Sequence, residues 1–210
     1  MPLQPSSLHF YFSSSSVICA RIRIAAHLKK IPLVPHPIKK TEDAYHASTS
    51  MHLNHRIIPT LTADYPNGQQ LTLTQSLSML EYFEEVYPGE QRLLPPVTDM
   101  RQRIMARDLA NLIAGFDYGI RPSVPKGDIV HDIRQLLHIS RCLEMYERLV
   151  KSSARRYSLG DQLSIADVCL IPLVQSGEHM GLQVGCWSSI NRIVTECRKI
   201  DAFRDALLQA

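Results

Sequence analysis

Four consecutive serines, Ser13 to Ser16, lie between a short apolar run and a segment with helical spacing. Ser16 directly precedes the helical segment, so we expect it to be the N-cap, whose hydroxyl accepts a hydrogen bond from a first-turn N–H. A serine hydroxyl in that place can instead donate to an anion, and a helix N-terminus lowers the pKa of a thiol held beside it. The stretch predicts either a polar loop with one cap or a site that stabilises a thiolate.

Two further stretches carry groups that could bind a small molecule. If the peptide bond between Ile58 and Pro59 is cis, the backbone N–H and C=O of Ile58 face outward and can pair with an extended peptide. A trans proline at the start of a strand is the equal alternative. Thr74-Gln75-Ser76 precedes a second helical segment, where these side chains either cap the helix or, with its free N–H groups, bind a carboxylate.

A third polar motif is G-D-Q-L-S-I-A-D, at residues 160 to 167. Ser164 and Asp167 have the S-x-x-D spacing of a capping box, with aspartate in the usual glutamate position, and an apolar helical segment follows. We interpret this motif as structural rather than catalytic.

The elements that must position these residues fall into two groups. Apolar spacing, β-branched residues and the Asn67-Gly68 turn signal predict the order β-α-β-α-β-β-α over roughly the first 90 residues. Residues 32–38 contain three prolines and predict an edge strand or an extended segment, and residues 41–54 have weak helical character. After Pro95-Pro96 only helical spacing occurs. The expected elements are strands at 8–12, 57–63 and 71–73, and helices at 16–30, 74–86, 99–115, 128–151, 164–180 and 187–208. The chain is therefore expected to hold an α/β domain at residues 1–90 and an all-helical domain at residues 91–210.

Composition narrows the classes of partner. The 210 residues are 45% hydrophobic and 20% charged, with a net charge of +3. Because no basic run exceeds two residues, we expect no nucleic-acid partner. No apolar run approaches the roughly 20 residues that a membrane span needs and no secretory signal is visible, so we expect no membrane partner. The five cysteines form no C-x-x-C pair, which favours a reducing, cytoplasmic compartment and argues against disulfides and a metal site.

Taken together, the motifs resemble those of glutathione transferases, specifically the zeta-class or maleylacetoacetate isomerase branch. The resemblance covers nearly the whole chain. It rests on A-R-I-R-I-A (20–25), I-I-P-T-L (57–61), L-T-Q-S-L-S-M-L-E-Y-F-E-E (73–85), R-L-L-P (92–95), D-L-A-N-L-I-A-G (108–115) and Y-S-L-G-D-Q-L-S-I-A-D-V-C-L-I-P (157–172). It implies the glutathione transferase fold, with a thioredoxin-like α/β N-terminal domain and an all-α C-terminal domain. It also implies glutathione as cofactor, bound between the two domains, and a homodimer.

The resemblance assigns the cofactor contacts to residues already singled out. In the family the proline is cis and the residue before it pairs with the cysteinyl part of glutathione, a role that falls on Ile58 and Pro59. The family's Gln-Ser pair binds the γ-glutamyl group, a role that falls on Gln75 and Ser76.

The catalytic serine of the family falls on Ser16 when the loop is aligned backward from Ala20 without gaps. The second serine and the cysteine of the family's S-S-C motif then correspond to Val17 and Ile18, so this chain departs from the motif. If Ser16 only caps the helix, Ser14 or Ser15 is the alternative partner of the glutathione sulfur.

The helical domain departs from the family as well. Tyr118 occupies the place of a glutathione-seating His or Gln, and Arg121 with Pro122 replaces a polar pair. An arginine thought to hold the substrate carboxylate corresponds to His179, a poorer anchor than a guanidinium. We therefore expect Arg121 and His179 to bind a substrate that differs from the family's.

The function implied is glutathione-dependent cis–trans isomerisation of a small unsaturated carbonyl or polyene acid, in tyrosine breakdown or as a tailoring step of secondary metabolism. One alternative is a glutathione transferase that conjugates electrophiles. The other is a catalytically silent binding protein with the same fold, which the lost S-C pair favours and the retained Ile58-Pro59 and Gln75-Ser76 pairs oppose.

Overall fold

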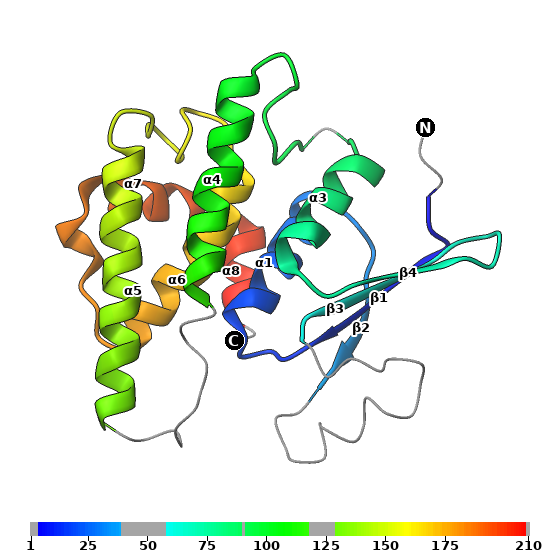
Figure 1. Ribbon diagram of the computed structural model, residues 1–210, viewed down its shortest axis with the longest axis horizontal. Helices are drawn as coiled ribbons and strands as arrows, with labels where there is room; N and C mark the ends of the chain where they lie inside the picture. Colours follow the sequence, from blue (N-terminus) through cyan, green and yellow to red (C-terminus); the bar gives the residue numbers. More distant parts are fainter. Residues whose placement is uncertain (1–3, 39–57, 90, 118–128, 209–210) are drawn as a thin grey trace. The chain divides into compact units, whose positions relative to one another are not determined.

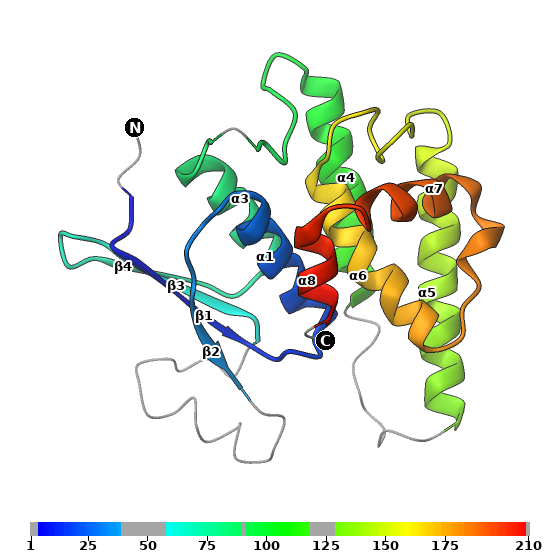
Figure 2. The same ribbon diagram turned by 180° about the vertical axis from the view of Figure 1, so that it is seen from behind.

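The computed structural model describes residues 4–38, 58–89, 91–117 and 129–208, which fall into two compact units (Figures 1 and 2). The first unit is Met1–Gln91 and the second is Arg92–Leu208. The weak helical character expected at residues 41–54 lies outside the described residues.

The first unit is built on one mixed sheet of four strands in the order β2-β1-β3-β4. β1 pairs in parallel with β2 and antiparallel with β3, and β3 pairs antiparallel with β4. The strands are β1 (Ser7–Phe12), β2 (Val34–Pro37), β3 (Thr60–Asp64) and β4 (Gln70–Leu73). The proline-rich strand lies at the sheet edge, as expected, because proline lacks an N–H to donate to a second neighbour.

Two helices, α1 (Val17–Leu28) and α3 (Ser76–Val86), lie on one side of this sheet (Figure 1). The alternation along β1 explains why, since Leu8, Phe10 and Phe12 are buried while the residues between them are partly exposed. Strand side chains point alternately to opposite faces, so the apolar set needs a cover that the two helices supply. In the described residues of this unit the order is β1-α1-β2, then β3-β4-α3 after the undescribed residues 39–57, which is a thioredoxin-like arrangement.

A buried ion pair ties the two helices together. Lys29, at the C-cap of α1, lies 2.7 Å from the Glu84 carboxylate of α3, and its Nζ also donates to the C=O of Gln91 at 3.0 Å. The two side chains are only 1% and 6% exposed. Removing either partner of such a pair leaves an uncompensated buried charge, so the pair fixes how α1 and α3 meet.

The described residues of the second unit form helices, with isolated β-bridges confined to residues 154–162. Its helices are α4 (Met100–Asp117), α5 (Ile129–Val150), α6 (Ile165–His179), α7 (Ser188–Cys197) and α8 (Asp201–Leu208), with a short 3-10 turn, η2, at Val184–Cys186. α6 is the central helix: it packs on α4, α5, α7 and α8, and most of its residues are buried. The single helix expected over 187–208 is wrong, because the chain turns at residues 198–200 and restarts at Asp201, an acidic residue suited to a helix N-terminus.

The N-terminus of α6 is fixed by the S-x-x-D motif, as expected. Asp167 accepts from the N–H and hydroxyl of Ser164 at 2.8 and 2.9 Å, and from the N–H and hydroxyl of Ser158 at 2.8 and 2.5 Å. The Ser158 hydroxyl also contacts the Tyr146 hydroxyl of α5 at 2.7 Å. All four residues are buried, so the capping box extends into a network that joins α5, α6 and the segment between them.

A second carboxylate caps α7 from another helix. Glu147 on α5 accepts from the backbone N–H groups of Ser189 and Ile190 at 3.0 and 2.9 Å. Partial burial by itself raises the pKa of Glu147, but these N–H groups outweigh it and the pKa is lowered. The carboxylate thus stabilises the free donors at the start of α7.

Glu147→Gln is therefore expected to lower the free energy of unfolding at neutral pH by roughly 1 kcal/mol or less. A lowered folded-state pKa gives stability that is present above the ordinary value of 4.5 and is lost as the pH falls through the folded pKa. Urea titrations from pH 7 to pH 3 should show the variant and the parent converging in acid. A difference that persists unchanged in acid would contradict the capping role.

Candidate active site

Three of the sequence-predicted motifs meet at one end of the sheet in the first unit. Tyr11 pairs with Thr60, which places the end of β1 next to the start of β3, immediately after Pro59. Leu61 pairs with Leu73, which places the end of β4 at the same end. Three segments therefore lie at the same end of the sheet, next to strands that are about 5 Å apart. They are the serine loop after β1, the Ile58-Pro59 pair before β3 and the Gln75-Ser76 pair after β4.

Within the serine loop, Ser16 is the N-cap of α1, as expected. Its Oγ accepts from the N–H of Cys19 at 3.3 Å, and its backbone is extended. Ser13 is buried, its C=O accepts from the N–H of Ser16, and its Oγ lies 3.4 Å from Ser15 Oγ. Ser14 and Ser15 are exposed. Because a serine hydroxyl has two lone pairs and one O–H, capping does not use the donor of Ser16, which remains able to bond an anion.

A charge that the sequence did not reveal supports this loop. The Arg23 guanidinium of α1 donates to the C=O of Ser14 at 3.3 Å and lies 5.6 Å from the ring centroid of Phe12. It therefore holds a positive charge against the serine loop, which favours an anion nearby. Arg23 lies nine positions after Ser14, and no spacing rule connects a helix side chain to the loop before it.

The peptide bond between Ile58 and Pro59 is cis. Of the cis and trans bonds that the sequence left as equal alternatives, the structure therefore has the cis bond. Pro59 is buried and Ile58 is 37% exposed, so the residue before the proline reaches the surface at this end of the sheet.

At the start of α3, Gln75 is the N-cap residue and is exposed, while Ser76 is the first helical residue and is 7% exposed. The Gln75 side chain makes no capping hydrogen bond to α3. Ordinary capping by this side chain is therefore not what the structure shows. An exposed amide and a helix N-terminus together are suited to a carboxylate ligand.

Comparison with known proteins agrees with this geometry. Residues 10–91 match the family model of the glutathione S-transferase N-terminal domain. The maleylacetoacetate isomerase of Emericella nidulans is 33% identical over 95% of this chain and 90% of its own length. The chain belongs to the maleylacetoacetate isomerase family, the zeta class of the glutathione transferases. The maleylacetoacetate isomerase maiA of Aspergillus fumigatus is 29% identical over 95% of this chain and 89% of its own length.

The fold of this family is also that of the solved relatives. The maleylacetoacetate isomerase of Anaeromyxobacter dehalogenans, with dicarboxyethyl glutathione and citrate bound in its active site, superposes with a TM-score of 0.83 and 25% identity, covering 97% of this chain and 95% of that chain. The expected glutathione transferase fold, a thioredoxin-like α/β domain and a helical domain, is confirmed.

The remaining predicted site residues are Tyr118, Arg121 and His179. Tyr118 and Arg121 lie outside the described residues. His179 is exposed at the C-terminal end of α6, in the second unit. The roles of all three remain predictions, as do the functional labels of the domains 1–90 and 91–210. In the described part of the chain, no cluster of three or more His, Cys, Asp or Glu side chains could hold a metal ion, and no helix has the length and apolarity to cross a membrane.

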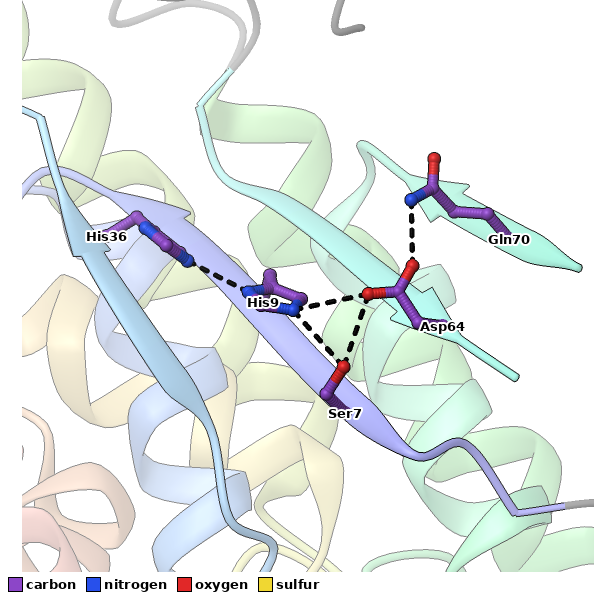
Figure 3. A network of polar contacts seen from close by, with 5 residues as sticks. All are labelled: Ser7, His9, His36, Asp64 and Gln70. Atoms are coloured by element: carbon purple, nitrogen blue, oxygen red, sulfur yellow. Dashed lines mark hydrogen bonds and ion pairs between the residues drawn. The ribbon is translucent and has the colours of Figure 1, made fainter. Parts of the chain in front are cut away.

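The structure also contains a polar network that sequence reasoning missed (Figure 3). His9 Nδ1 lies 3.0 Å from His36 Nε2, and His9 Nε2 lies 3.2 Å from the Asp64 carboxylate. Asp64 also accepts from Gln70 at 2.8 Å and from Ser7 at 3.2 Å. The pKa of His36 is lowered, mainly by burial and also by the neighbouring His9. The pKa of Asp64 is lowered as well, chiefly by the hydrogen bond from Gln70. One residue or more comes from each strand, so the network fastens all four strands together.

Proposed function

We propose that this chain is a glutathione-dependent cis–trans isomerase of a small unsaturated carbonyl acid. The observation that carries the proposal is the meeting of the serine loop, the Ile58-Pro59 pair and the Gln75-Ser76 pair at one sheet end, in a member of the maleylacetoacetate isomerase family. Glutathione supplies the thiolate that adds to the double bond, allows rotation and leaves again.

The residues at the sheet end fit this tripeptide. Gln75, with the first N–H groups of α3 and the Ser76 hydroxyl, would bind the γ-glutamyl carboxylate and amine. Ile58 would present backbone groups to the cysteinyl part, next to the buried Pro59. Residues 1–90 would thus bind glutathione, and residues 91–210 would bind the substrate.

Ser16 would hold the sulfur in its ionised form. Its O–H remains available while its oxygen accepts from Cys19, and the positive end of α1 and the Arg23 charge act on the same loop. Ser15 and Ser14 are the alternative donors, since both are exposed in the turn that Ser13 closes.

The substrate class is proposed to be an unsaturated acid with at least one carboxylate. A structural relative carries a dicarboxyethyl group on its bound glutathione. In this chain Arg121 and His179 are the proposed substrate ligands, and Tyr118 is a proposed glutathione ligand. Tyr118 or Arg121 would also stabilise the negative charge that develops on the carbonyl oxygen.

The test is turnover of maleylacetone with and without glutathione, with free thiol measured throughout. Isomerised product with constant thiol is the expected result. Loss of substrate with an equal loss of thiol would instead identify a conjugating transferase. Absence of glutathione binding in calorimetry at millimolar ligand would leave only a silent binding protein.

We also propose that the protein is a homodimer in the cytoplasm. Large apolar side chains are exposed just before and within the first turns of α4 and on the solvent-facing side of α5, and these two helices pack on each other. They are Val97, Met100, Ile104, Ile133, Leu137, Met145 and Leu149. All five cysteines are free thiols, as is usual in a reducing compartment.

Light scattering is expected to report a dimer for the parent protein. The double variant Ile133→Lys and Leu137→Lys should dissociate it, because two buried charges oppose a second copy. A matched variant away from α4 and α5, Arg204→Gln on α8, should leave the mass unchanged. A parent protein that remains monomeric at micromolar concentration would exclude the homodimer.

A further inference from the structure

A basic hollow of about 550 Å³ lies in the second unit, between α7 and the segment that follows α5. The hollow is wide open to solvent, so a ligand in it would be held by charge rather than by burial. It contains none of the residues assigned above to glutathione or substrate. Its lining consists of Ala154, Arg155, Arg156, Arg192, Glu196 and Lys199.

The charge of this hollow is unbalanced. Glu196 is shared between Lys199, at 2.5 Å, and Arg156, at 3.9 Å. Arg155 lies 3.7 Å from Asp161. Four cations therefore face two carboxylates, which leaves an excess of two positive charges around a concave surface. Such a surface attracts anions.

Arg192 is the cation that is best prepared for a ligand. Its Nε donates to the C=O of Arg155 at 2.6 Å and its Nη2 to the C=O of Ala154 at 3.0 Å. Within the described residues no carboxylate pairs with it. A guanidinium has five N–H donors, so two bonds to carbonyl groups fix its plane and leave three N–H groups for an anion.

The segment that presents Arg155 and Arg156 is ordered by its own hydrogen bonds. The N–H of Arg155 donates to the C=O of Tyr157, the N–H of Tyr157 to the C=O of Gly160, and the N–H of Gly160 to the C=O of Ser153. The same segment contains Ser158, which is bonded to buried Asp167. The backbone under the basic hollow is therefore fixed, while the side chains of Arg155, Arg156 and Lys199 remain 77%, 60% and 64% exposed.

We propose that the basic hollow binds a small molecule with two neighbouring phosphate groups. Planar guanidinium groups match phosphate oxygens bidentately, and their hydrogen bonds are charge-assisted. Three guanidinium groups and one ammonium group around a space of this size exceed what a single phosphate can contact. The diphosphate can belong to a nucleotide or to inorganic pyrophosphate, and the ligand arms of the test separate these sources.

The test is calorimetric titration of the full-length protein with pyrophosphate, ADP and adenosine at low ionic strength, where surface charge is least screened. Saturable binding of pyrophosphate and ADP, and none of adenosine, is expected. Equal affinities would identify the diphosphate group alone as the ligand, and tighter binding of ADP would identify a nucleotide. No saturable binding of either at ~5 mM would overturn the proposal, since a site weaker than this has almost no specific binding energy.

Two variants with opposite expected effects guard against misfolding as an explanation. Arg192→Gln should weaken pyrophosphate binding about tenfold or more, the effect of losing roughly 1.4 kcal/mol. Glu196→Gln should strengthen it, because Arg156 and Lys199 lose their competing carboxylate. Arg148→Gln, outside the hollow and paired with Glu144 in the same helix, is the matched control and should leave the affinity unchanged. Equal affinities for the Arg192, Glu196 and parent proteins would overturn the assignment to this hollow.

Discussion

Replacing Asp167 by alanine is expected to lower the free energy of unfolding of the helical unit by about 3–5 kcal/mol. Its two carboxylate oxygens accept four hydrogen bonds, two from backbone N–H groups and two from hydroxyls. The side chain is fully buried, so water cannot replace the lost acceptor. Each buried donor left without a partner costs roughly 1–3 kcal/mol. The loss also removes the N-terminal cap of α6, on which four other helices pack.

Urea unfolding followed by tryptophan fluorescence measures this effect directly, because the single tryptophan, Trp187, lies in the helical unit at the start of α7. Asp161→Ala is the matched control. Asp161 lies in the same segment, but its side chain is 63% exposed and forms a long, solvent-exposed ion pair with Arg155 at 3.7 Å. Its removal should therefore cost less than about 0.5 kcal/mol. An Asp167→Ala change below 1 kcal/mol would show that the network does not hold the unit together.

The second large effect is expected on catalysis. Ser16→Ala should lower the isomerisation kcat by about 100-fold or more, the usual cost of removing a donor to a reacting anion. Its affinity for glutathione should stay nearly intact, because Ile58 and Gln75 carry the proposed contacts to the rest of the tripeptide. Gln75→Ala should do the reverse, weakening glutathione binding about tenfold or more while kcat at saturating glutathione stays close to that of the parent.

Loss of the cap has to be separated from loss of the donor in this experiment. Ser16→Thr keeps both a capping oxygen and an O–H and should remain active, whereas Ser16→Ala loses both. Ser14→Ala and Ser15→Ala leave the cap in place. Turnover lost in either of them and retained in Ser16→Ala would move the sulfur contact to that neighbouring serine. Equal effects of Ser16→Ala and Gln75→Ala on affinity would contradict the proposed division of roles.

Sequence patterns predicted correctly those structural features that depend only on residues close together in the sequence. The cap at Ser16, the capping box at Asp167 and the proline-rich edge strand all follow from the chemistry of a few neighbouring residues. The turn at Asn67-Gly68 is of the same kind, since Gly68 adopts a φ of 81° that other residues rarely tolerate.

Features that depend on contacts between residues far apart in the sequence could not be predicted from local patterns. The common position of the three site motifs depends on strand register between residues as far apart as Tyr11 and Thr60. The His9–His36 contact requires two strands to lie side by side, and the Arg23–Ser14 bond requires a helix to turn back to its own loop. The resemblance to the family pointed to the same site residues because it carries information about such pairings that spacing alone lacks.

The central claim is that glutathione binds at this sheet end and that a serine hydroxyl keeps its thiol ionised. The ultraviolet absorbance of the thiolate, followed during a pH titration of the glutathione complex, tests this claim most directly. In the parent protein the bound thiol should titrate well below the ordinary thiol pKa of about 8.5, and in Ser16→Ala its pKa should return toward that value. A bound thiol with an ordinary pKa in the parent protein, or the same lowered pKa in all the serine variants, would contradict the account.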